Sequence, residues 1–405
     1  MIDAAERQIP HRGMRLLRLS LTDFRNYPAL IWRPAARISV LFGPNGSGKT
    51  NLLEAISLLV PGRGLRGARN ADLARRGGAG GWAVAARFAT GEGELDIGTG
   101  TAPEGPTDRR VFRLDGVAPR TQAEVAAHTA AVWLTPQMDR LFLEGLSGRR
   151  RFLDRLVWAL EPGHAREVAA HDAAMSSRNR LLAEARPGGW DDAWLAGLED
   201  AMARHAVAAT AARLGLVRRL NEVLTGGGNL GAFPSACIGL ECPIAARMAE
   251  ASALHVEDWL RGSLAANRQR DAAAGSAGLG AHRTDLQLTE AATGTPAALA
   301  STGEQKGLLV AVLLAHASLI AGARGFTPLL LLDEPAVHLD PSRRAALFAA
   351  LAELSAQIIM TGTDGETFLP LADVAEGLWT GGGELHPDAR FTGSKSASSS
   401  VAEGL

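Results

Sequence analysis

Eight residues near the N-terminus have the types and spacing of a phosphate-binding loop. They fit the pattern G-x-x-x-x-G-K-[ST] and are Gly43, Pro44, Asn45, Gly46, Ser47, Gly48, Lys49 and Thr50. In such a loop the backbone N–H groups turn toward phosphate oxygens, and the following helix adds the positive end of its dipole. Lys49 is expected to reach the β- and γ-phosphates, and the Thr50 hydroxyl to ligate Mg²⁺. The alternative is a chance glycine-rich loop. However, the chain has only three lysines, and one of them stands where this chemistry requires it.

Two carboxylates downstream supply the other half of a nucleotide site. Asp333 and Glu334 directly follow four leucines, a run typical of a buried strand. In a doubly wound sheet this strand would lie beside the P-loop strand, with its carboxyl end facing the phosphates. Asp333 would then hold Mg²⁺ through water, and Glu334 would polarise the attacking water. Lys49 and Glu334 are therefore candidate catalytic residues.

Two further motifs flank the acidic pair. Ser301, Thr302, Gly303 and Glu304 open an apolar helix, which places a serine hydroxyl and free N–H groups at a helix N-terminus. Ser301 could equally be a helix cap with Glu304 as its capping-box partner, and the two roles are compatible. Asp340 follows in a Leu-Asp pair shortly after the acidic residues.

The elements that must position these residues follow from hydrophobic patterning. Expected strands are 14–21, 29–32, 38–42 and 130–135, a small antiparallel meander over 82–89, 94–97 and 109–116, and later strands at 329–332 and, as the last, 357–361. Expected helices are 51–59 after the P-loop, and 147–160, 164–185, 191–224 and 251–269 in an alanine-rich stretch. This order predicts an α/β head made of 14–138 and 281–388, an inserted helical lobe at 139–270, and flexible tails at 1–13 and 389–405.

Arginine clusters are candidates for binding an anionic partner. Arg149, Arg150 and Arg151 begin a helix, where positive charge opposes the helix dipole, so DNA or a salt-bridge network with Asp154 and Glu161 must favour them. Arg63 and Arg66 lie in a glycine-rich stretch that is either a solvated loop or a phosphate or DNA contact. Tyr27, the single tyrosine, could pack on an adenine ring or hold a structural turn.

Composition places further limits on function. The formal net charge of −1 means that a DNA surface must be a local basic patch. Two cysteines without metal or redox spacing indicate a reducing cytosol. The sequence shows neither an apolar run of about 20 residues nor a signal-peptide core, so a cytoplasmic protein with no membrane partner is expected.

The order of these motifs resembles the ATPase head of the ABC superfamily. That resemblance implies ATP and Mg²⁺ bound between two heads, with Lys49, Thr50, Gln137, Asp333 and Glu334 acting in one subunit. Ser301, Gly303 and the Asp340 loop would act from the other subunit. Many ABC proteins also place a histidine after the last core strand, whereas the residues here are Met360, Thr361, Gly362 and Thr363.

Finer matches resemble the SMC-like RecF family. They are Leu21–Tyr27, the Arg149–Asp154 helix start, Ser177–Leu182 and Ala281–Leu286. Membership implies ATP-dependent dimerisation on DNA, weak DNA-dependent ATPase activity, and a role in DNA replication, repair and the SOS response. It also implies work with RecO and RecR to place RecA at single-strand gaps.

Two other classes share the nucleotide motifs. An SMC-type chromosome-organising ATPase would need long heptads and a hinge, which the sequence lacks. A nucleotide-binding subunit of a membrane transporter would not need the helical insert.

Overall fold

A computed structural model describes residues 14–78, 80–102, 109–184, 189–226 and 233–393. The chain divides into two compact units. The first contains the chain up to Met138, residues 229–233, and the chain from Leu313 onward. The second contains residues 139–228 and 234–312. The expected tail at 1–13 and the end of the tail from 394 lie outside the described residues.

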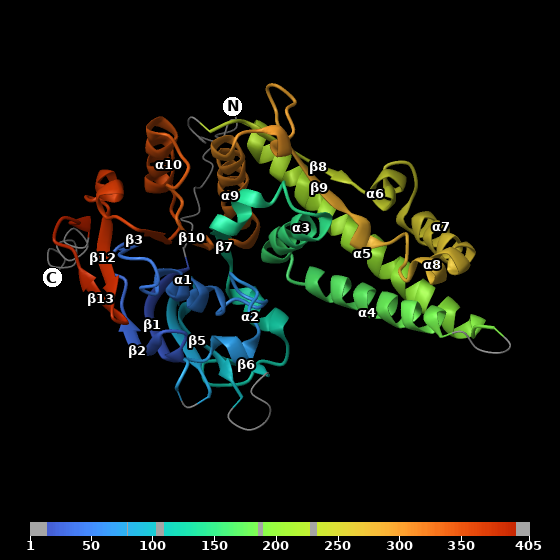
Figure 1. The fold of residues 1–405 in the computed structure, drawn as a ribbon, viewed down its shortest axis with the longest axis horizontal. Coiled ribbons are helices and arrows are strands. Elements are labelled where there is room, and N and C mark those ends of the chain that lie inside the picture. Colours follow the sequence, from blue (N-terminus) through green and yellow to red (C-terminus); the bar gives the residue numbers. More distant parts are fainter. Residues whose placement is uncertain (1–13, 79, 103–108, 185–188, 227–232, 394–405) are drawn as a thin grey trace, which may run out of the picture. The chain divides into compact units, whose positions relative to one another are not determined.

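The first unit is built around a six-stranded sheet with the order β13-β12-β3-β11-β10-β7. Its strands are β3 (Ile38–Phe42), β7 (Ala131–Leu134), β10 (Leu329–Leu332), β11 (Ile358–Gly362), β12 (Ala375–Gly381) and β13 (Glu384–Pro387). All neighbours pair in parallel except β12 and β13. Every residue of β3, β7, β10 and β11 is buried, as expected for strands that are covered on both faces. The expectation that 357–361 forms the last strand is wrong, because β12 and β13 extend the sheet beyond it (Figure 1).

A five-stranded antiparallel sheet with the order β2-β1-β4-β5-β6 completes the strands of this unit. Its strands are β1 (Arg15–Phe24), β2 (Tyr27–Trp32), β4 (Ala83–Thr90), β5 (Gly93–Thr101) and β6 (Arg110–Leu114). The expected meander is confirmed as β4, β5 and β6. The two sheets are tied together where the side chain of Gln357, just before β11, accepts from the backbone N–H of Leu16 at 2.6 Å.

The helices of the first unit are short. They are α1 (Lys49–Ser57), α2 (Gln122–His128) and α10 (Pro341–Glu353), with 3₁₀ turns at η1 (Asn70–Leu73), η2 (Pro136–Arg140) and η5 (Glu366–Leu371). A longer helix, α9 (Thr302–Arg324), begins in the second unit and ends in the first. Among the described residues α9 alone is long and apolar enough to cross a membrane, but 78% of its apolar window is buried, as in a core helix.

The second unit is mainly helical. Its helices are α3 (Leu146–Leu160), α4 (His164–Ala183), α5 (Asp192–Thr225), α6 (Pro243–Met248), α7 (Ala253–Ala266) and α8 (Arg268–Ala274), with 3₁₀ turns η3 (Ala281–Arg283) and η4 (Ala297–Leu299). Helices α4 and α5 run side by side (Figure 1). They bury Ala174, Met202, Ala206 and Val207 in a core shared with α6 and α7.

The second unit was expected to end at residue 270, and this bound is wrong. Two strands, β8 (Ala236–Glu241) and β9 (Asp285–Glu290), pair along their whole length in an antiparallel sheet. Because β9 pairs with β8, the chain does not return to the head at residue 281, and this unit continues to Val312.

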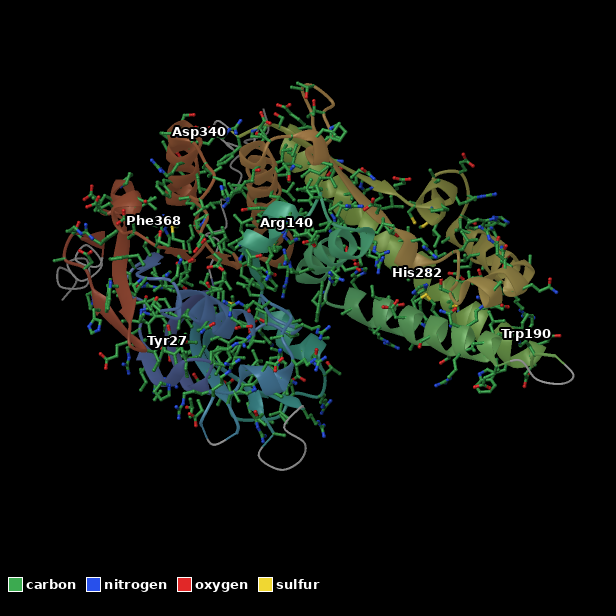
Figure 2. The ribbon with its side chains drawn as sticks, in the orientation of Figure 1. Tyr27, Arg140, Trp190, His282, Asp340 and Phe368 are labelled. Carbon is green, nitrogen blue, oxygen red and sulfur yellow. The ribbon has the colours of Figure 1, made fainter. Side chains whose placement is uncertain are left out.

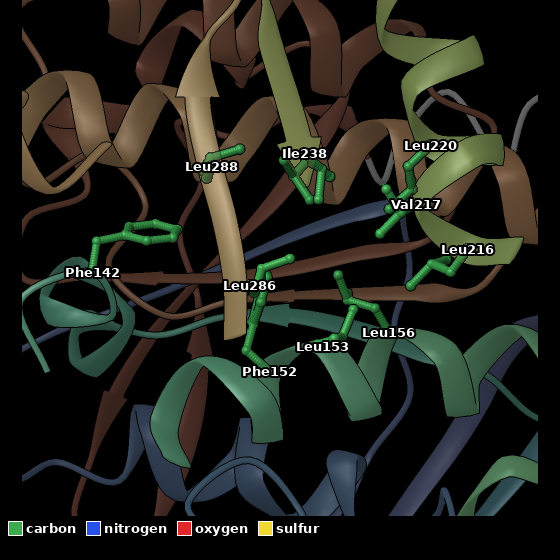
Figure 3. Close-up of a pocket in the computed structure, with 11 residues that line it drawn as sticks. Phe142, Phe152, Leu153, Leu156, Leu216, Val217, Leu220, Ile238, Leu286 and Leu288 are labelled. Carbon is green, nitrogen blue, oxygen red and sulfur yellow. The ribbon is translucent and has the colours of Figure 1, made fainter. Parts of the chain in front are cut away.

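The apolar faces of β8 and β9 pack on α3 and α5. Phe152, Leu156, Leu216, Ile238 and Leu286 point toward one another around a cavity of about 10 Å³ whose lining is entirely apolar (Figure 3). A space of this size and polarity is a small packing gap that stays dry and holds no ligand.

Candidate functional site

The P-loop connects β3 to α1 and has the backbone conformation of a phosphate cradle. Gly46 and Gly48 have φ of 79° and 110°, in the left-handed region that glycine adopts without steric cost. A Cβ on Gly48 would lie 2.7 Å from the Tyr27 hydroxyl, so no larger residue fits there. Gly48 caps α1 and provides no side chain to satisfy the first N–H groups of this helix. Those groups can therefore donate to an anion.

Lys49 lies across the mouth of this loop. Its ammonium donates to the carbonyl oxygens of Gly43 at 2.7 Å and Pro44 at 2.8 Å. Burial lowers the pKa of Lys49, while the carboxylates of Glu334 and Asp333 act in the opposite direction. The side chain is thus held over the cradle, within the electrostatic influence of both acidic residues.

The carboxyl ends of three strands of the parallel sheet bring the predicted residues to one edge. The P-loop follows β3, the acidic pair follows β10, and Gln137 lies in η2 just after β7, with its side chain exposed. The Thr50 hydroxyl donates to Asp333 Oδ1 at 2.9 Å, which joins the P-loop directly to the acidic pair. A hydroxyl and a carboxylate oxygen this close are the type of ligands that Mg²⁺ binds alongside phosphates.

Thr361, at the end of β11, lies where many ABC proteins have a histidine, and the sequence left open whether a threonine there contacts the γ-phosphate or whether that role is missing. Its hydroxyl donates to Asp333 Oδ1 at 2.7 Å and accepts from the backbone N–H of Glu334 at 3.0 Å. Glu334 has a φ of 50°, an uncommon conformation for a non-glycine residue. The sequence signal was the polar residue at the end of an otherwise apolar strand.

Tyr27 packs beneath the backbone of the P-loop, where its ring is closed to solvent. The side chain is fully buried, and its hydroxyl donates to the Gly48 carbonyl at 3.1 Å. Burial raises the pKa of this phenol. Of the two roles considered for Tyr27, the structural one is therefore correct, and packing on an adenine ring is excluded.

A hollow of about 850 Å³ opens beside the P-loop in the same unit. Asn26 and Asn51 line it: Asn51 donates to Asn26 at 2.8 Å, and Asn26 donates to the Ser47 carbonyl at 3.1 Å. The rest of its lining combines three arginines with small residues and an aspartate, namely Arg25, Arg75, Arg76, Ala68, Ala71, Ala74 and Asp72. Arg66 donates to Asn51 at 2.7 Å and also pairs with the buried Glu54.

Two residues that were expected to act from a second subunit belong to a different unit from the P-loop. Ser301 and Gly303 belong to the second unit, where Ser301 Oγ donates to Glu304 at 2.8 Å and its N–H donates to the same carboxylate at 2.9 Å. The expected capping box is therefore present, and the Ser301 side chain stays exposed. Asp340 lies in the first unit as the N-cap of α10 and accepts from the N–H groups of Ser342 and Arg343, both at 2.9 Å (Figure 2).

The predicted arginine cluster is partly engaged inside the second unit. Arg149 pairs with Asp285 through contacts of 2.6 and 2.9 Å, and Arg150 donates to the His282 carbonyl. Arg151 is exposed.

The alternative partners expected for this cluster are wrong. Asp154 pairs instead with Arg213 and His164, and Glu161 with Arg219. Apart from His164 at the start of α4, these ion-pair partners come from β9 and α5, which lie far from α3 in the sequence.

Comparison with known proteins agrees with this architecture. Residues 15–378 match the family model described as RecF/RecN/SMC N terminal domain. The DNA replication and repair protein RecF of Mesorhizobium japonicum is 47% identical over 371 residues, which cover 91% of this chain and 97% of that protein. RecF of Rhizobium etli is 46% identical over the same extent.

A solved structure described as the recombination mediator protein RecF-ATPrS in RecFOR pathway has the same fold. It superposes with a TM-score of 0.81 at 20% identity and covers 93% of this chain and 99% of that one. The fold, the family model and the relatives of high identity agree over most of the chain. The chain therefore belongs to the RecF family of DNA replication and repair proteins.

Proposed function

We propose that this protein binds ATP with Mg²⁺ at the edge of the sheet that carries the P-loop, and that it dimerises on DNA in the ATP-bound state. Slow ATP hydrolysis then releases the dimer from DNA. The observation that carries the proposal is the 2.9 Å hydrogen bond between Thr50 and Asp333, which makes the P-loop and the acidic pair one site. A solved structure described as RecF with ATP has the same fold, with a TM-score of 0.78 at 20% identity.

The roles of the residues follow from their positions. N–H groups from Gly46 to Thr50 and the Lys49 ammonium hold the phosphates, and Lys49 stabilises the charge that develops on the transferred group. Glu334 orients the attacking water and accepts its proton, and Gln137 helps to place that water. Thr50 and Asp333 supply oxygen ligands for Mg²⁺, which would neutralise phosphate charge.

The hollow beside the P-loop is the proposed site of the nucleoside end of ATP. Its volume of about 850 Å³ lies within the usual range of ligand pockets. Asn51 is one residue past Thr50 on α1, so this hollow continues directly from the cradle. Side-chain amides and arginines here can hydrogen-bond the ribose and the base.

The second half of the site is proposed to come from another subunit. Ser301 and Gly303 begin the long helix α9 and offer a hydroxyl and helix N–H groups to a γ-phosphate. The loop at Asp340 would complete the same composite interface. ATP binding would then drive formation of a homodimer.

Light scattering with ATP tests this dimer. The chain should be monomeric alone, and dimeric with ATP and Mg²⁺ in the presence of duplex, gapped or single-stranded DNA. A monomer under every one of these conditions would contradict the composite site. Comparing the DNA forms also shows which DNA structure the protein prefers.

Arginines of the second unit and of the P-loop unit are the proposed DNA contacts. Arg151 and Arg63 are exposed, whereas Arg149 and Arg150 already have partners inside the unit. We therefore expect Arg151→Glu to weaken DNA binding and to reduce the slope of log affinity against log salt by about one. The matched control, Arg204→Glu on the exposed face of α5, should bind DNA as the parent does. Unchanged affinity and salt slope in Arg151→Glu would move the DNA surface away from α3.

In the cell, the proposed role is to act with RecO and RecR at single-strand gaps, to help place RecA, and thereby to support the SOS response. Family membership and the description of the solved relative as part of the RecFOR pathway support this role. RecA assembly on gapped DNA, measured with and without the protein, RecO and RecR, tests it. A cytoplasmic location accords with these partners.

A further inference from the structure

Thr361 contacts both acidic residues of the site without being part of any nucleotide-binding motif described above. Its side chain is fully buried, and its single hydroxyl makes two hydrogen bonds. It donates to Asp333 Oδ1 at 2.7 Å and accepts from the Glu334 N–H at 3.0 Å. The hydroxyl therefore uses its one proton and a lone pair on two adjacent residues that directly follow β10.

Strand register places the hydroxyl there. Strand β11 lies between β3 and β10, and Met360 pairs with Leu332. Thr361 is therefore one residue beyond the last pair, level with the point where β10 ends and the acidic residues begin. The three residues before Thr361 are all apolar and buried, so a hydroxyl here adds nothing to the core and acts through its partners.

The two partners need this support for different reasons. Asp333 Oδ1 accepts from both Thr50 and Thr361. Once the Thr50 hydroxyl turns to a metal ion, Thr361 is the hydroxyl that still holds the carboxylate in place. Glu334 has a φ of 50°, a conformation that persists only where surrounding contacts hold it. The hydrogen bond from its N–H to Thr361 is one such contact.

We propose that Thr361 is a positioning residue for ATP hydrolysis, fixing the Asp333 carboxylate for the metal and the Glu334 backbone for activation of water. The inference rests on the proposed ATPase function. In this role Thr361 acts through these two neighbours. Many ABC proteins have a histidine after this strand, and this sequence has Thr361 at the end of β11 and no histidine there.

Steady-state ATPase kinetics of Thr361→Val and Thr361→Ser test the proposal. Valine keeps the shape and removes the hydroxyl, so kcat should fall by roughly 10- to 100-fold while KM changes by less than about threefold. The Mg²⁺ concentration for half-maximal activity should rise severalfold, a change that a purely structural role does not produce. Serine restores the hydroxyl and should keep kcat within about threefold of the parent.

Thr327→Val is the matched control. Thr327 is also a buried threonine beside β10, but at the opposite end of the strand, and within the described residues its hydroxyl has no hydrogen-bond partner. The Thr327→Val variant should hydrolyse ATP as the parent does. Thr361→Ala removes the same hydroxyl and carries the test if the valine variant does not fold.

The outcomes separate this inference from the proposed function. A parent protein without ATPase activity that depends on Glu334 would contradict the function itself. If Glu334→Gln abolishes turnover but Thr361→Val keeps a parental kcat, only the role of Thr361 is overturned. Equal loss in the serine and valine variants would likewise overturn it, because serine keeps the hydroxyl.

Discussion

Glu334 is the residue whose loss should separate ATP binding from ATP turnover. It follows Asp333 at the carboxyl end of β10, and its carboxylate opposes the lowering of the Lys49 pKa by burial. Glu334→Gln keeps the size of the side chain but cannot take a proton from water, so turnover should fall by roughly 10²- to 10⁴-fold. ATP should still bind and hold the protein as a dimer, which ATPase assays and light scattering would measure together.

The control for this variant is Glu384→Gln, a change to an exposed carboxylate on β13. It should leave both turnover and dimerisation as in the parent. Full turnover in Glu334→Gln would assign the activation of water to another residue.

Single residues of this site were predictable where chemistry requires fixed types at fixed spacing. Lys49, Thr50, Asp333 and Glu334 are consecutive pairs in two motifs, so no knowledge of the fold was needed to find them. Thr361 was noted only as one of the residues where many ABC proteins have a histidine, because its contacts depend on the register of β11 against β10. Tyr27 had two possible roles, and only its burial beneath Gly48 decided between them.

Helices α4 and α5 are held together by a buried charge network. Arg178 is fully buried and donates to Glu199 at 3.0 Å, to Asp271 at 2.8 Å and to the Leu264 carbonyl at 2.7 Å. Arg178→Met leaves Asp271 and this carbonyl without that donor. We expect the free energy of unfolding to fall by about 3–5 kcal/mol, measured by urea denaturation.

An exposed ion pair of the same helix provides the comparison. Arg204 and Asp200 on α5 are separated by 3.0 Å and remain largely solvent-exposed. Arg204→Met should therefore cost no more than about 1 kcal/mol. Equal costs for the two variants would show that the buried network does not stabilise the α4–α5 pair.

The ring of His282 makes the second unit sensitive to acid. Burial lowers the pKa of His282 to about 4, and the positive charges of Arg283 and Arg150 and the stacked His171 act in the same direction. The Ala277 carbonyl opposes this shift by accepting from the ring at 2.9 Å. In the unfolded chain the His282 ring binds a proton near pH 6.5, whereas in the folded chain it does so only near pH 4. The contribution of the neutral ring to the free energy of unfolding is therefore complete above pH 6.5 and falls as the pH drops toward 4.

Thermal unfolding between pH 7.5 and pH 5 checks this expectation. Tm of the parent should fall more steeply than Tm of His282→Gln, which lacks the titrating ring. His386→Gln, at an exposed position of β13, should follow the parent. Parallel curves for the parent and His282→Gln would contradict the assigned direction.

At the level of elements, local patterns were more predictable than distant pairings. Helices α3, α4 and α5 begin and end close to where the 3.6-residue period places them. Strands β8 and β9 were not found, because each gains its partner only across the intervening helices α6, α7 and α8. The same long-range pairing supplies Asp285 to Arg149, a partner that helical spacing within α3 could not indicate.

For the whole molecule, motif order predicted the α/β head and its insert, but the extent of the insert depended on the pairing of β8 with β9. Motif order placed Ser301 in the same head as Lys49, whereas the structure assigns the two residues to different units. A site assembled from two subunits makes a specific prediction about mixtures of defective proteins. Lys49→Ala removes the phosphate-binding cation, and Ser301→Arg places a bulky cation at the exposed start of α9. Each variant alone should have almost no ATPase activity, because both of its composite sites are damaged.

Mixing the two variants should restore activity. In a two-fold symmetric heterodimer, one site receives both substitutions and the other receives neither. Random pairing in an equal mixture makes about half of the dimers heterodimers, so about a quarter of the parental ATPase activity should return. The substitution at Ser301 also removes a helix cap, which costs about 1 kcal/mol and leaves the fold intact. A mixture no more active than its components would place Ser301 outside the site of the partner subunit, and the P-loop edge would then have to work within one chain.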